Sequence, residues 1–141
     1  MVYPTPQSPM HYQFDPVNRI HTFTFYASNR QAVDLWLEQM NRIYEDVDPA
    51  QPVLFLMDTR ISGALPITYG FTKGRQWVRR LDVHPPAYIA LVHVVDGSAM
   101  SLIMTFLRSL RLGHLTTHWF SSETAYEEAV QWLSQSAASQ R

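Results

Sequence analysis

The sequence contains no cysteine and a single lysine, Lys73, and each of these two scarcities removes a class of chemistry. Without thiols the chain can form no disulfide, no thiolate metal site and no cysteine nucleophile. The lack of disulfides suits a reducing compartment, and we expect a cytoplasmic location. A receiver domain needs a lysine on a late strand, whereas Lys73 falls within a predicted helix. The sequence therefore argues against a receiver domain.

Several other features are missing as well. No apolar run approaches the roughly 20 residues that cross a bilayer, and residues 1–16 have neither the basic start nor the apolar stretch of a signal peptide. The formal net charge of −1 gives no basic surface for nucleic acid. We therefore expect no transmembrane segment and no nucleic-acid partner.

Catalytic and cofactor motifs are absent too. There is no Gly-x-Gly-x-x-Gly and no Walker loop for a nucleotide cofactor, and no Gly-x-Ser-x-Gly for a serine nucleophile. His114 and His118 are four residues apart, but they flank a predicted strand rather than lying on one helix face. His93 lies inside an apolar strand, where a structural role is the usual one. We expect no enzyme, no cofactor and no metal.

The most informative segment that is present runs from residue 52 to residue 60. Pro52 opens it, the apolar run Val53-Leu54-Phe55-Leu56-Met57 follows, and Asp58 closes it. Apolar side chains at consecutive positions point to both faces of a strand, which is typical of a central strand in a parallel sheet. Asp58 then stands at the carboxyl end of that strand, where open α/β sheets place their binding crevice.

The remaining segments alternate between strand and helix patterns after an opening hairpin. This alternation predicts one α/β domain with a mostly parallel sheet and an N-terminal antiparallel hairpin, in the order β-β-α-β-α-β-α-β-α. We expect a disordered leader over 1–9, the domain over 10–133 and a flexible tail over 134–141. The expected strands are 10–14, 20–26, 52–58, 87–95 and 115–120, and the expected helices are 28–45, 66–81, 98–112 and 123–133.

The second predicted helix carries a basic outer face and an unassigned tryptophan. Its apolar residues keep helical spacing and predict the inner stripe, and Gly70 and Gly74 lie near that stripe, where they would allow close approach to the sheet. Trp77 falls off this stripe, so we predict that it is an exposed contact. The predicted inner stripe is Ile67, Phe71, Gly74, Val78 and Leu81, and the basic residues outside it are Lys73, Arg75, Arg79 and Arg80.

Polar residues follow the two central strands and predict a candidate site. Asp58 and Thr59 come after one strand, and Asp96 and Ser98 come after the next. Parallel strands end at the same sheet edge, where helix N-termini also favour anions. One interpretation is a phosphoryl or ligand site in the crevice formed by Asp58, Asp96 and Ser98. The other is ordinary turn and cap chemistry, which uses the same residue types.

The order of elements and three local features resemble the STAS domain, the fold of bacterial anti-sigma-factor antagonists and their SpoIIAA-like relatives. The features are the strand that ends in Asp58-Thr59, the strand 87–95 with its following turn and helix, and the ending Trp119-Phe120-Ser121-Ser122-Glu123 with Glu127 to Leu133. In that family an Asp-Ser-Ser-Gly segment carries a phosphorylated serine. The segment 58–63 matches it in part, so the resemblance implies Thr59 and Ser62, with Gly63, as candidates for phosphorylation.

These observations predict a non-enzymatic signalling or regulatory domain. It would present the loop Asp58, Thr59, Ser62 and Gly63 and the following helix to a protein partner, with a second copy of the chain as one such partner. The alternative is a small-molecule or lipid binder that uses the crevice at the carboxyl ends of the strands. An enzyme is the third option.

Overall fold

A computed structural model of the chain describes residues 8–63, 65–93, 101, 104, 105, 108 and 115–139. Strands and helices alternate after an opening hairpin, as the sequence predicts, and residues 101, 104, 105 and 108 are helical. The elements are β1 (Met10–Asp15), β2 (Ile20–Phe25), α1 (Arg30–Glu45), β3 (Val53–Asp58), α2 (Ile67–Val78), β4 (Ala87–Val92), β5 (Leu115–Phe120) and α4 (Ala125–Ser139).

The strands form one five-stranded sheet in the order β1-β2-β3-β4-β5. β1 pairs with β2 in the antiparallel sense, and every later pair is parallel. This confirms the predicted α/β class, the opening hairpin and the mostly parallel sheet. In the register of the two central strands, Asp58 lies opposite Val92, so both strands end at the same level.

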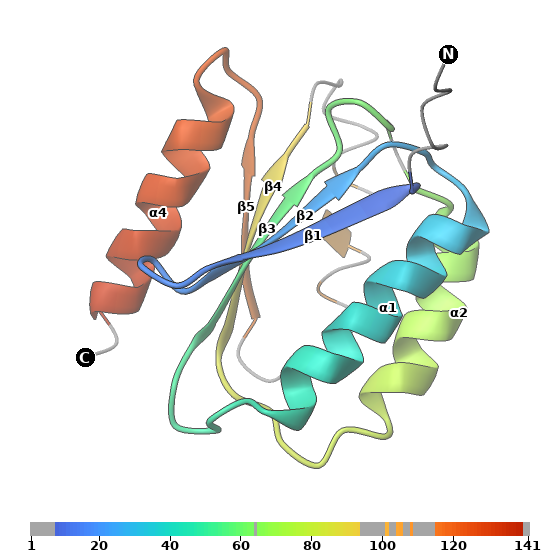
Figure 1. Cartoon of the computed structure of the whole chain (residues 1–141), viewed down its shortest axis with the longest axis horizontal. Coiled ribbons are helices and arrows are strands. Elements are labelled where there is room, and N and C mark those ends of the chain that lie inside the picture. Colours follow the sequence, from blue (N-terminus) through green and yellow to red (C-terminus); the bar gives the residue numbers. More distant parts are fainter. Residues whose placement is uncertain are drawn as a thin grey trace, which may run out of the picture.

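The sheet is covered on both faces (Figure 1). Helices α1 and α2 lie on one face, and α4 lies on the other. All six residues of β3 are buried: Phe55 and Met57 pack toward α1 and α2, while Leu54 and Leu56 pack toward α4. The prediction that β3 is buried on both faces is therefore confirmed.

Helix ends differ from the prediction by small shifts with clear physical causes. The helix expected from residue 28 begins at Arg30, and its capping side chain is Asn29, whose Oδ1 accepts a hydrogen bond of 2.9 Å from the Ala32 N–H. Asn is as good a cap as Ser, so composition alone does not choose between them. Helix α4 continues to Ser139, which makes most of the segment assigned to a flexible tail helical.

Trp77 is buried, with 7% of its surface exposed, and the prediction of an exposed contact at this position is wrong. The inward stripe of α2 is formed by Gly70, Gly74 and Trp77. The Trp77 ring meets the Tyr44 ring edge-on at 5.2 Å, and its Nε1–H donates to Asn41 Oδ1 at 3.3 Å. Because the two glycines carry no side chains, Trp77 supplies most of the apolar surface of this stripe against α1.

Candidate functional site

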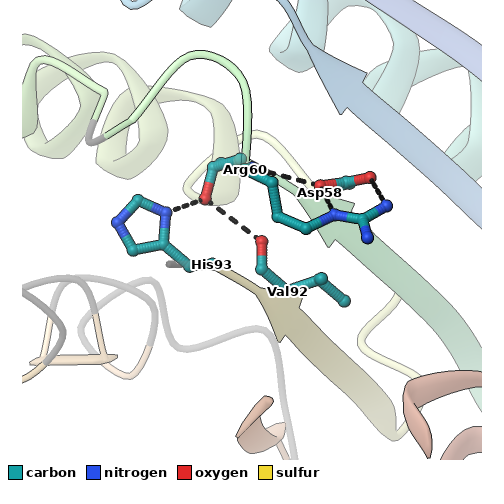
Figure 2. A network of polar contacts seen from close by, with 5 residues as sticks. Asp58, Arg60, Val92 and His93 are labelled. Carbon is teal, nitrogen blue, oxygen red and sulfur yellow. Dashed lines mark hydrogen bonds and ion pairs between the residues drawn. The ribbon is translucent and has the colours of Figure 1, made fainter. Parts of the chain in front are cut away.

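The candidate site lies at the carboxyl ends of β3 and β4, which pair side by side. Asp58 and Thr59 are buried there, with 6% and 3% of their surfaces exposed. The Thr59 N–H donates to the Val92 carbonyl at 2.9 Å, which extends the ladder one residue beyond β3. Two networks fix the chain as it leaves the sheet, one through Arg60 and one through His93 (Figure 2).

Asp58 forms a two-pronged ion pair with Arg60. Arg60 Nε donates to Asp58 Oδ1 at 2.9 Å, and Arg60 Nη2 donates to Asp58 Oδ2 at 2.7 Å. The Arg60 N–H also donates to Asp58 Oδ1, at 3.1 Å. The hydrogen bonds that Arg60 donates to Asp58 raise the pKa of Arg60, whose guanidinium also lies over the Tyr126 ring of α4 at 5.6 Å. The Asp58–Arg60 ion pair thus links the end of β3 to α4, which covers the face of the sheet opposite α1 and α2.

Thr59 is held by His93, which is 1% exposed and follows directly after β4. Thr59 Oγ1 is hydrogen-bonded to His93 Nδ1 and lies 3.4 Å from the Val92 carbonyl oxygen. His93 Nε2 is buried and has no hydrogen-bond partner within the part of the chain that the structure describes. Burial lowers the pKa of His93, so a neutral ring holds Thr59 in place.

The tip of the loop 60–63 is more exposed than the buried Asp58 and Thr59 that precede it. Ile61 is 67% exposed, and Ser62, which donates to the Gly63 carbonyl at 2.9 Å, is half-buried. Gly63 has φ of 75°, a conformation that suits glycine, and its N–H donates to the Thr59 carbonyl at 2.9 Å. Of the two predicted phosphorylation sites, Ser62 is therefore accessible in this conformation, while the Thr59 hydroxyl is inside the protein.

The other predicted site residues are not described beside Asp58 and Thr59. Asp96 and Ser98 lie outside the described residues, so the predicted crevice is described only on its Asp58 side. Within the described ranges, no three histidine or acidic side chains are grouped as a metal site requires. No helix among the described residues has the length and apolar character needed to cross a bilayer.

Sequence reasoning missed the pairing of Thr59 with His93. The sequence predicts a strand over 87–95 that includes His93, whereas β4 ends at Val92. The available signal is a lone histidine at the end of an apolar run, opposite a threonine at the end of the neighbouring run. That signal becomes visible only when the parallel register of the two strands is known.

Comparison with known proteins gives no match: no protein-family model, no curated protein and no solved structure resembles the chain closely enough to count.

We expect the protein to lose stability as the pH falls from 6.5 toward 4. Burial, reinforced by the charge of Arg19, lowers the pKa of His21 from 6.5 to about 4, and burial also lowers the pKa of His93. Between these pH values the two histidines bind protons more readily in the unfolded chain than in the folded chain, so protonation favours unfolding. The measurement is urea unfolding followed by tryptophan fluorescence across this range.

Two variants separate this effect from general acid sensitivity. His21→Phe keeps a ring but removes the titrating group, so its stability should vary less with pH than that of the wild type. His84→Gln alters an exposed histidine and should retain the wild-type dependence. An unchanged dependence in His21→Phe would refute the assignment.

Proposed function

We propose that the chain is a non-enzymatic, STAS-like regulatory domain that binds a protein partner through the loop 60–63 and the adjoining surface of α2. The observation that carries the proposal is the combination of an exposed Ile61 with a buried, hydrogen-bonded base beneath it. A loop anchored in this way loses little conformational entropy on binding, which favours affinity. Apolar tips on anchored loops are typical of recognition surfaces.

The chemistry of the surrounding surface suggests what the partner looks like. The exposed residues of α2 include two cations, Lys73 and Arg75, whereas the Arg60 guanidinium is already paired with Asp58. A complementary partner would offer an apolar pocket for Ile61 and an acidic rim for these cations of α2. Ser62 follows Ile61 directly in the loop, so a phosphate there would add negative charge next to the recognition tip and weaken binding to an acidic partner. The exposed basic residues of α2 are Lys73 and Arg75, and the exposed Arg79 and Arg80 follow the end of the helix.

The proposal predicts site-specific cross-linking in the host cell. A photoreactive side chain at position 61 should capture one protein species, whose mass tells a second copy of the chain from a different partner. Val17 is the matched control, because it is an aliphatic residue that is 87% exposed on the hairpin turn. Capture of nothing at position 61, or of the same species at both positions, would defeat the proposal.

A ligand site at the carboxyl ends of the strands is the second candidate. The single observation that favours it is His93 Nε2, a buried polar atom with no partner among the described residues, at the end of β4. A polar group of a small molecule or lipid would satisfy that nitrogen. This candidate predicts that His93→Phe abolishes ligand binding, while Ile61→Glu leaves it unchanged.

A further inference from the structure

A pocket of about 450 Å³ lies at the opposite end of the sheet, near the amino ends of β2 and β3. The β1–β2 hairpin supplies one wall, and the last turn of α1 with the segment that follows supplies the other. Its volume falls within the range of small-molecule sites, and its lining mixes aromatic, aliphatic and charged side chains. Nothing in the proposed interaction surface uses this pocket.

One wall of the pocket is a set of aromatic rings. The rings of Phe14 and His21 have centroids 4.7 Å apart, and Tyr12 stacks on His21 at 5.9 Å with an interplanar angle of 17°. A hydrogen bond of 2.7 Å joins the Tyr12 hydroxyl to His21 Nδ1, which fixes the histidine ring. Phe14 is 41% exposed, so its ring remains available to a planar ligand.

Arg19 supplies the free positive charge of the pocket. It belongs to the hairpin turn, and its side chain has no ion pair among the described residues. The charge of Arg19 acts on His21, since it contributes to the lowered pKa of that ring. The Arg19 guanidinium therefore lies close enough to the His21 ring to interact with it electrostatically.

The other charged groups that line the pocket are less available or lie on the opposite wall. Arg42 is paired with Glu38 at 2.8 Å, and Asp48 Oδ1 accepts from the Ala50 N–H at 2.9 Å. Asp46 and Asp48 are exposed, as Arg19 is, so water screens all three charges, and both acids lie on the wall opposite Arg19. An incoming ligand thus meets the uncompensated cation of Arg19 on the same wall as the rings.

The backbone of Arg19 supports a role for its side chain. Its φ is 60°, in the left-handed region that favours glycine or asparagine and is strained for other residues. The turn has its own stabilising bonds, since Asp15 Oδ1 accepts from the Val17 and Asn18 N–H groups and Asp15 Oδ2 accepts from the Asn18 side chain. The turn does not depend on an arginine at position 19.

We propose that this pocket binds a small planar aromatic carboxylate, with its ring against Phe14 and His21 and its carboxylate on Arg19. Guanidinium and carboxylate groups form charge-assisted hydrogen bonds in a planar arrangement. The aliphatic side chains of Ile43 and Val47 close the other side of the ring.

The test titrates the full-length, isotope-labelled chain with indole-3-acetate and with tryptamine, which share a ring but carry opposite charges. Indole-3-acetate should bind at least about tenfold more tightly and should shift the amide signals of residues 19–21 and 39–43. Tryptamine binding as tightly, no saturable binding of indole-3-acetate, or shifts confined to other residues would each overturn the proposal.

Arg19→Gly provides the decisive variant, because glycine removes the charge and suits the left-handed backbone. It should weaken indole-3-acetate binding by about tenfold or more while the melting temperature holds or rises. Arg79→Gln removes the exposed arginine that follows α2 and should leave binding unchanged. Equal affinities in Arg19→Gly and Arg79→Gln would refute the assigned role of Arg19. Ile61→Glu should also bind normally, which separates this site from the proposed partner surface.

Discussion

Thr59→Glu should lower the free energy of unfolding by about 3 kcal/mol, whereas Ser62→Glu should change it by less than about 0.5 kcal/mol. Thr59 is 3% exposed, and its hydroxyl is enclosed between His93 and the Val92 carbonyl. A glutamate there must bury a carboxylate or displace β4, and pairing with a protonated His93 is opposed by the burial that lowers the pKa of that ring. Ser62 has no comparable enclosure.

The measurement is chemical unfolding of both variants beside Thr59→Ser, which keeps the hydroxyl and removes only a methyl group. Thr59→Ser should lose about 1 kcal/mol at most. A folded, stable Thr59→Glu protein with altered partner binding would contradict this account, because it would make Thr59 a surface position. The structure therefore directs any test of phosphorylation to Ser62.

Trp77→Ala should be at least as damaging, with a loss of about 3–5 kcal/mol. The substitution leaves a cavity between α2 and α1, where the Trp77 ring contacts Tyr44. It also removes the Trp77 N–H that donates a hydrogen bond to Asn41 Oδ1. Trp77→Phe retains an aromatic ring and loses the hydrogen bond, so its loss should be about 1–2 kcal/mol. Thermal or urea unfolding of the two variants gives the comparison.

Gln76→Ala is the matched control for this series, because Gln76 precedes Trp77 on the exposed side of α2. It should alter stability by less than about 0.5 kcal/mol. If Trp77→Ala were as mild as Gln76→Ala and instead impaired partner binding, Trp77 would be the surface contact that the sequence predicts. The burial described above would then be wrong.

The features that could be predicted from the sequence are those set by local pattern. The consecutive apolar residues of β3 require burial on both faces, and its six residues are indeed buried. The alternation of strands and helices implies the parallel sheet. Asp58 could be predicted as a candidate site residue because the same alternation implies parallel strands. Such strands end at one edge of the sheet, where open α/β sheets place their binding crevices.

The features that could not be predicted depend on contacts between distant segments. The sequence pattern places Trp77 outside because the predicted stripe runs through Phe71 and Val78, which are only half-buried, whereas the buried residues of α2 are Gly70, Gly74 and Trp77. The Thr59–His93 pair joins residues 34 positions apart and needs the strand register. The aromatic pocket needs the β1–β2 hairpin and the end of α1 to meet, which no local pattern encodes.

The measurement that tests the central claim most directly is the affinity of the cross-linked partner, once purified, for Ile61→Glu and Val17→Glu. Both variants place one carboxylate at an exposed aliphatic position, so neither should disturb the fold. The account predicts that Ile61→Glu weakens binding by at least about tenfold and that Val17→Glu stays within about twofold of the wild type. Equal affinities in the two variants would contradict the claim that the loop 60–63 is the recognition surface.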